Sequence, residues 1–192
     1  MLIVHIISTD DTKDFAKLYT AVSYPVHPTV LINPTRQTLR VAILEEKQQE
    51  SPTLVLIGHG TEYGLLDTDL KTYLVDQRWH GMLATMTVIG IWCYAGNFAN
   101  RLGLRGFFTS NFVSNSEELL ELGISSVPAS DYQWTCDRIS WENKTFASMI
   151  GEFLARDYPL ALWCKDLQKY SDASPHIFVK YNYEAFYCSE SE

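Results

Sequence analysis

The 192-residue sequence lacks the features that mark several large functional classes. It contains no cluster of Lys or Arg, and 15 basic against 23 acidic residues give a formal net charge of −8. An acidic chain of this kind is poorly suited to bind nucleic acid phosphates or anionic lipid. It also lacks any apolar run of the roughly 20 residues that a membrane-spanning helix needs. We therefore expect partners that are neither nucleic acid nor membrane.

Cysteine is scarce, and the four residues Cys93, Cys136, Cys164 and Cys188 lie far apart without a CxxC pair. This spacing favours separate thiols of an intracellular protein over a disulfide framework or a zinc site. In the first segment, MLIVHIISTDD, no Lys or Arg precedes the apolar stretch, and that stretch is too short for a secretion signal. We therefore expect a cytoplasmic protein with a single domain over residues 1–192.

Motifs of several other enzyme classes are absent as well. Ala99 occupies the position where a tyrosine-phosphatase loop starting at Cys93 has arginine. The pair Gly58 and Gly60 is followed by Tyr63, where a dinucleotide fingerprint has its third glycine. The sequence has no G-x-S-x-G elbow of a serine hydrolase and no H-E-x-x-H zinc helix. We therefore expect neither a metal nor a cofactor.

Short apolar runs alternate with longer amphipathic segments, as in an α/β protein with helices on the faces of a sheet. The runs 53–57 and 87–92 are apolar at nearly every position, which is typical of strands in the middle of a parallel sheet. Segment 64–75 interrupts the alternation and predicts a small β-hairpin. We predict a three-layer α/β/α sandwich with a mostly parallel sheet of Rossmann-like or flavodoxin-like topology. The expected strands are 2–7, 29–32, 53–57, 87–92, 106–113 and 177–181, the expected helices are 35–49, 78–85, 96–103 and 146–154, and segment 125–143 is expected to be irregular.

Two neighbouring predicted strands end in a histidine and a cysteine. His59 follows the run LVLIG, and Cys93 follows VIGIW. Ends of adjacent parallel strands lie about 5 Å apart, which brings these side chains within reach of each other. Taken singly, each residue is more simply interpreted as a backbone-bonded histidine or a small buried cysteine. Together, beside glycine-rich turns, they favour a shared site in which the imidazole activates the thiol as a nucleophile.

The backbone around this pair suggests how such a site would handle an acyl group. The N–H groups of Gly60 and Cys93 are candidates for an oxyanion hole that stabilises a tetrahedral intermediate. Trp92 precedes the cysteine, and Asn111 and Ser114 come at the end of the next predicted strand. We name these three residues as candidate substrate-binding residues. The pattern as a whole suits acyl transfer, of which peptide hydrolysis is the commonest case.

The blocks LVLIGHG and VIGIWC resemble the His-Gly and Cys blocks of the caspase-like superfamily of cysteine peptidases, which includes caspases, metacaspases, legumains, gingipains and separases. The resemblance covers roughly residues 1–115 and includes the small hairpin that this superfamily inserts after the His-Gly block. It implies a caspase-like fold, His59 as general base, Cys93 as nucleophile, and a peptide or protein substrate. The residue before the cysteine is usually small in the superfamily and is Trp92 here. The alternative is a catalytically inactive caspase-like domain that serves as a protein-binding scaffold.

Overall fold

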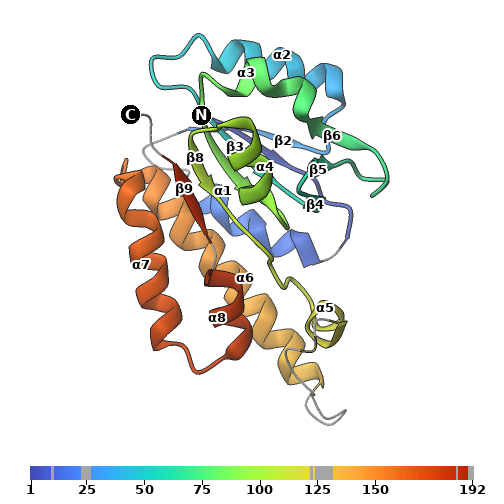
Figure 1. Cartoon of the computed structure of the whole chain (residues 1–192), viewed down its shortest axis with the longest axis vertical. Helices are drawn as coiled ribbons and strands as arrows, with labels where there is room; N and C mark the ends of the chain where they lie inside the picture. The colour runs from blue at the N-terminus through green and yellow to red at the C-terminus, as the bar shows by residue number, and fades with distance from the viewer. Residues whose placement is uncertain (10, 23–26, 122, 124–131, 185, 190–192) are drawn as a thin grey trace.

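The computed structural model describes residues 1–9, 11–22, 27–121, 123, 132–184 and 186–189, and it contains a six-stranded sheet with helices on both faces (Figure 1). The strands are β1 (Leu2–His5), β2 (Thr29–Ile32), β3 (Thr53–Ile57), β4 (Gly60–Thr61), β5 (Gly64–Leu66), β6 (Tyr73–Asp76), β7 (Thr87–Ile91), β8 (Gly106–Phe108) and β9 (Tyr187–Ser189). The α-helices are α1 (Lys17–Val22), α2 (Arg36–Glu46), α3 (His80–Leu83), α4 (Ala95–Leu102), α5 (Ser116–Glu121), α6 (Tyr132–Ala155), α7 (Leu160–Ala173) and α8 (Ile177–Tyr183). Two 3-10 helices, η1 (Asp11–Ala16) and η2 (Gln77–Trp79), precede α1 and α3.

The main sheet has the order β2-β1-β3-β7-β8-β9, and all its pairs are parallel except β8 with β9. The parallel part follows the flavodoxin-like order 2-1-3-4-5, so the strand order reverses between β1 and β3. Ligands of such sheets bind outside the carboxyl ends of the strands near this reversal. The predicted α/β fold with a mostly parallel sheet is confirmed.

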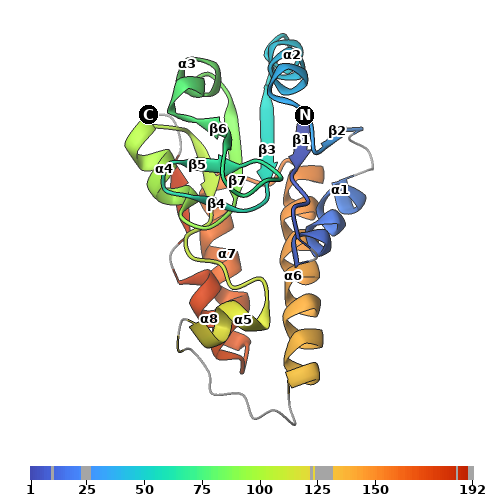
Figure 2. The same ribbon diagram turned by 90° about the vertical axis from the view of Figure 1, so that its right-hand side faces the viewer.

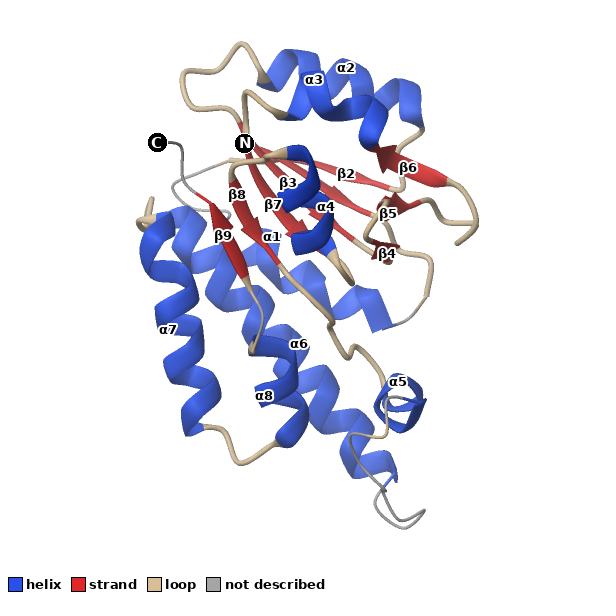
Figure 3. Ribbon diagram, in the orientation of Figure 1, coloured by secondary structure: helices blue, strands red, loops and turns tan. Residues whose placement is uncertain are grey.

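Helices cover the two faces of the sheet and give it two separate cores (Figures 2 and 3). Within β3, Val55 and Ile57 belong to the core shared with α1, α6, α7 and α8, whereas Leu54 and Leu56 belong to the core shared with α2, α3 and α4. All four side chains are completely buried. The unbroken apolar run of β3 therefore reflects burial on both faces, as the sequence predicts for a central parallel strand.

A second, smaller sheet lies at the carboxyl edge of the main sheet. It consists of β4, β5 and β6 in antiparallel order and begins directly after His59. Gly64 adopts a φ of 146°, and a Cβ atom there would lie 2.0 Å from the Val75 carbonyl oxygen. This close approach of β5 to β6 requires glycine at position 64. The predicted hairpin over 64–75 is confirmed.

One predicted strand is wrong, and a second, 106–113, is shorter than predicted. Segment 177–181 is part of helix α8, because the buried residues Phe178, Val179, Asn182 and Tyr183 follow helical spacing once the segment is read to its end. The edge strand is instead β9, which pairs antiparallel with β8. Strand β8 ends at Phe108, because the next residue, Thr109, turns its side chain to the backbone of Trp92.

Helix boundaries also differ from the prediction, by one or two residues at each end of α3 (predicted as 78–85) and α4 (predicted as 96–103). Thr35 caps α2 by accepting a hydrogen bond from the Thr38 N–H, so the helix begins one residue later than expected and ends at Glu46. Helix α6 begins at Tyr132, inside the segment 125–143 for which the sequence predicts irregular structure. Residues 125–131 of that segment lie outside the described residues.

The prediction of four separate thiols is wrong for one pair. Cys164 on α7 and Cys188 on β9 form a disulfide, and Cys93 and Cys136 are free thiols. The two bonded cysteines are 24 positions apart in the sequence, and they come together because α7 packs against β9. Among the described residues, no helix is long and apolar enough to span a membrane, and no cluster of three or more His, Cys, Asp or Glu side chains is placed to hold a metal ion.

Candidate functional site

His59 and Cys93 occupy equivalent positions on two adjacent central strands. The β3–β7 ladder pairs Ile57 with Ile91, and each candidate residue follows two positions later. The Gly58 N–H donates a 3.1 Å hydrogen bond to the Ile91 carbonyl oxygen, which extends the ladder past the last paired residues. Since neighbouring strands run about 4.8 Å apart, both residues leave the sheet at the same point of its carboxyl edge.

Both residues line one small cavity of about 20 Å³. The chain segments after β1, β3, β7 and β8 all contribute to its wall, so the cavity lies next to the β1–β3 reversal of strand order. Its volume is close to that of a single enclosed water molecule. The lining residues are Thr12, Phe15, Gly58, His59, Ile91, Trp92, Cys93, Phe112 and Ser114.

The imidazole of His59 is half-buried and bonded to the segment that follows β1. Its Nε2 atom lies 2.7 Å from the hydroxyl oxygen of Thr9. The backbone carbonyl of Thr9 in turn accepts a 3.1 Å hydrogen bond from the hydroxyl of Thr12, a cavity residue. These contacts tie the orientation of the His59 ring to the same segment that forms one wall of the cavity.

Cys93 is half-buried at the turn from β7 into α4, and its Sγ atom lies 3.5 Å from the Phe112 carbonyl oxygen. The next residue, Tyr94, has a φ of 66°, a left-handed conformation that a bulky residue rarely adopts. Such strained turns concentrate at functional sites, where they hold a side chain in a fixed direction. Helix α4 begins immediately afterwards at Ala95, so Cys93 stands two residues before its first turn.

Gly60 is the first residue of β4 and pairs with Leu65. The neighbouring Leu66 N–H donates a 2.9 Å hydrogen bond to the His59 carbonyl oxygen. In the alternating pattern of an antiparallel ladder, this bond makes Gly60 and Leu65 a pair without mutual backbone hydrogen bonds, so the Gly60 N–H points away from β5. Gly60 is not among the residues that line the cavity, and the oxyanion role of its N–H stays a prediction.

The indole of Trp92 packs on the opposite side of the sheet from Cys93. Only 2% of Trp92 is exposed, and its ring lies in the core with Phe98. A Cβ atom at Gly60 would lie 2.1 Å from the indole Cδ1, and the indole Nε1 donates a 3.1 Å hydrogen bond to the Thr61 carbonyl oxygen. Trp92 lines the cavity, and its side chain also supports the β4 segment that follows His59.

The two other candidate substrate-binding residues differ in position. Ser114 lines the cavity, and its backbone N–H and hydroxyl both donate to the Glu118 carboxylate, at 2.7 and 3.0 Å. Asn111 is not among the lining residues, and its Nδ2 donates a 2.8 Å hydrogen bond to the Tyr181 hydroxyl. The structure therefore brings Ser114 to the site and does not place Asn111 among the lining residues.

Sequence reasoning missed the residues after β1. Thr9, Thr12 and Phe15 belong to a stretch that resembles a helix start, and they reach the site because β1 is adjacent to β3. His5, at the end of β1, donates from Nε2 to the Thr12 carbonyl oxygen at 2.8 Å. Burial lowers the pKa of His5 to about 4, against the smaller opposing effect of that hydrogen bond. A neutral imidazole therefore anchors Thr12 at the cavity wall.

A comparison of the chain with known protein families, with curated proteins and with solved structures found no match to any of them.

Proposed function

We propose that this chain is a caspase-like cysteine peptidase in which Cys93 attacks a peptide or related acyl bond and His59 acts as general base. The observation that carries the proposal is the equivalent placement of the two residues, each two positions beyond the paired Ile57 and Ile91, on one shared cavity. An imidazole and a thiol held at adjacent strand ends form the pair that nucleophilic catalysis by cysteine requires.

The order of elements supports the caspase-like assignment. Histidine follows the third strand of the main sheet along the chain, and cysteine follows the fourth. The small β4–β5–β6 sheet begins directly after the His-Gly block, as the resemblance implies. The left-handed Tyr94 and the amino end of α4 next to Cys93 support a nucleophile held at a sharp turn.

In the proposed reaction, His59 takes the proton of the Cys93 thiol and the thiolate attacks the carbonyl carbon of the substrate. The carbonyl oxygen becomes an oxyanion, which accepts hydrogen bonds from the N–H groups of Gly60 and Cys93. The C–N bond then breaks, and the His59 imidazolium gives its proton to the leaving amine. Water, deprotonated by His59, hydrolyses the thioester and restores the thiol.

Thiol labelling tests this proposal, because the chain contains its own comparator. Cys136 is also a half-buried free thiol, and its Sγ lies 3.2 Å from the Ser116 hydroxyl oxygen. We expect iodoacetamide at neutral pH to label Cys93 faster than Cys136. His59→Ala is expected to slow labelling of Cys93 by at least about tenfold, since the proton acceptor is lost. Cys136→Ala leaves the Cys93 rate unchanged.

Equal labelling of both thiols, or a Cys93 rate that does not depend on His59, contradicts the proposed pair. A peptide-library screen then measures cleavage, with Cys93→Ser as the inactive control. Cleavage that survives in Cys93→Ser contradicts the role of Cys93 as nucleophile.

A second candidate function is an inactive caspase-like domain that serves as a protein-binding scaffold. The size of the cavity favours it, because about 20 Å³ holds a water molecule and no substrate side chain. The two candidates differ in the screen: the scaffold predicts no cleavage of any library peptide even where Cys93 labels rapidly.

A further inference from the structure

A second and larger cavity lies on the helical face opposite to α6 and α7. Its volume is about 400 Å³, and its lining residues belong to α2, η2 and α3. Three arginines line it, namely Arg36 and Arg40 on α2 and Arg78 on η2. Met82 adds apolar surface to the same wall, and Trp79, of which only 6% is exposed, adds a smaller part. This volume is within the range of small-molecule binding sites.

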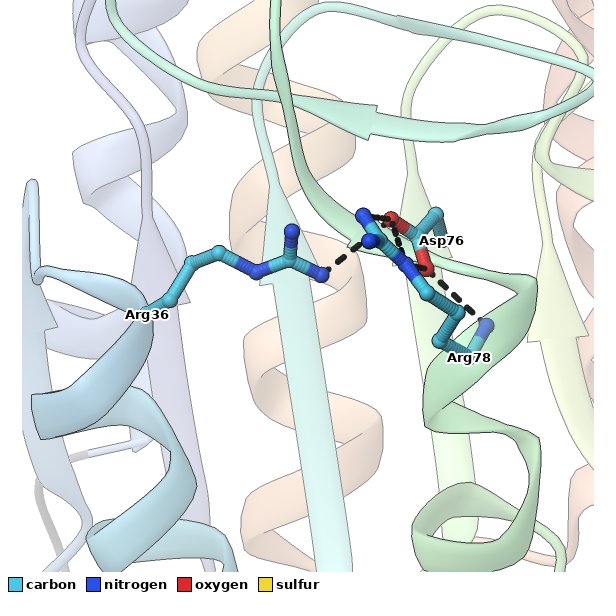
Figure 4. A network of polar contacts seen from close by, with 3 residues as sticks. All are labelled: Arg36, Asp76 and Arg78. Atoms are coloured by element: carbon cyan, nitrogen blue, oxygen red, sulfur yellow. Dashed lines mark hydrogen bonds and ion pairs between the residues drawn. The ribbon is translucent and has the colours of Figure 1, made fainter.

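One carboxylate holds two of the three guanidinium groups in place (Figure 4). Asp76, at the end of β6, accepts hydrogen bonds from Arg36 at 3.1 Å and from the Arg78 Nε at 3.0 Å. The backbone N–H of Arg78 also donates to it at 2.9 Å. Hydrogen bonds from the Arg78 side chain lower the pKa of Asp76 to about 2, in spite of its burial. The carboxylate is therefore charged at any physiological pH, and it orients both arginines before a ligand arrives.

Arg40, the third arginine, adds a further positive charge to the cavity. Arg40 is exposed and forms no ion pair or hydrogen bond with the described residues. It lies four positions after Arg36, so the two side chains emerge from the same face of α2. Three arginines and Asp76 leave a local charge of +2 in a chain whose formal net charge is −8.

We propose that this cavity binds a small organic phosphate, with Arg36, Arg40 and Arg78 contacting the phosphate and Trp79 and Met82 contacting the organic part. Guanidinium groups present paired N–H donors that match phosphate oxygens, and the local charge of +2 matches a dianion. The volume suits a mononucleotide-sized molecule better than a polymer, and the acidic chain disfavours nucleic acid. This proposal is independent of the peptidase proposal.

Calorimetric titration of the full chain with pyrophosphate and with adenosine diphosphate tests the site. We expect binding of both, and tighter binding of the nucleotide because its organic part contacts apolar surface. Arg40→Gln is expected to weaken both affinities by at least about tenfold, the loss of one charge-assisted hydrogen bond. The fold is expected to be retained in this variant, because no described residue bonds to Arg40. The thermal midpoint of the free variant checks this point.

Arg156→Gln is the matched control. Arg156 is also exposed, follows α6, and among the described residues its side chain forms an ion pair with Glu152 alone. The control is expected to keep the wild-type affinities, and so is Cys93→Ser, which removes the proposed nucleophile. No heat of binding at millimolar ligand, or an unchanged affinity in Arg40→Gln, would falsify the phosphate site. A glutamate-rich peptide that binds more tightly than either phosphate, with the same dependence on Arg40, assigns the cavity to an acidic peptide and overturns the proposal.

Discussion

Acid should destabilise this protein through His5, a buried residue that bonds to Thr12 in the wall of the candidate site. His5 is completely buried on β1, and its Nε2–H donates to the Thr12 carbonyl oxygen at 2.8 Å. Its Nδ1 atom has no hydrogen-bond partner among the described residues. Protonation would therefore create a buried cation with an unpaired N–H group, and burial lowers the pKa of His5 from 6.5 to about 4.

The sign and size of the effect follow from linkage. Below pH 6.5 the unfolded chain takes up a proton at His5 while the folded chain does not, so the free energy of unfolding falls as the pH falls. The loss attributable to His5 is about 2 kcal/mol at pH 5 and about 3 kcal/mol at pH 4, where the folded protein begins to protonate. Above pH 6.5, the pKa of His5 in the unfolded chain, His5 does not change the free energy of unfolding with pH.

Urea unfolding at pH 7, 6, 5 and 4 measures this loss by comparison with His5→Gln. The glutamine keeps an N–H donor for the Thr12 carbonyl but does not titrate, so the difference between the two pH profiles isolates the contribution of His5. His80→Gln is the control, because His80 is exposed at the start of α3. The reasoning is refuted if the wild type and His5→Gln lose stability in parallel between pH 7 and pH 5.

Two further predictions concern stability. Gly60→Ala is expected to lower the free energy of unfolding by about 1–3 kcal/mol, because the new Cβ would lie 2.1 Å from Trp92 and overpack the core. Gly81→Ala is expected to be neutral or stabilising, because Gly81 has open space around it in α3. Thermal unfolding of both variants measures the difference, and equal effects would contradict the reasoning. Cys188→Ser is expected to lower the free energy of unfolding by about 3 kcal/mol under oxidising conditions, because the disulfide closes a loop over 24 residues. The same variant should match the wild type once a reductant is present, and a deficit that persists after reduction would show that the serine acts by another route.

Much of the sheet is predictable because its signal is local. The strands 29–32 and 53–57 have the boundaries that the sequence predicts, since short runs of apolar and β-branched residues between turn-forming residues favour strands. The meeting of His59 and Cys93 on one cavity is predictable from the two central runs: both residues end such runs, and parallel neighbours end at a common edge. The catalytic role of the pair stays a prediction.

The carboxyl-terminal part is harder to predict because its elements depend on distant partners. The five residues of segment 177–181 are apolar enough for a strand or a helix. Helix α8 is favoured by contacts outside that segment, where the Asn182 side chain donates to and accepts from the backbone of Val113. The disulfide between Cys164 and Cys188 has the same origin, because only the packing of α7 on β9 brings the two cysteines together.

The central strands, and His59 and Cys93 at their ends, can be located from the sequence alone, because burial on both faces produces an apolar run that can be recognised without knowing its partners. The surroundings of those two residues depend instead on how distant segments pack. The hydroxyl of Thr9 reaches His59 across 50 positions of sequence, and Arg36 reaches Asp76 across 40. Contacts of that kind leave no periodic pattern in the chain, since they arise from the order in which strands and helices pack and not from the spacing of residues along any one of them.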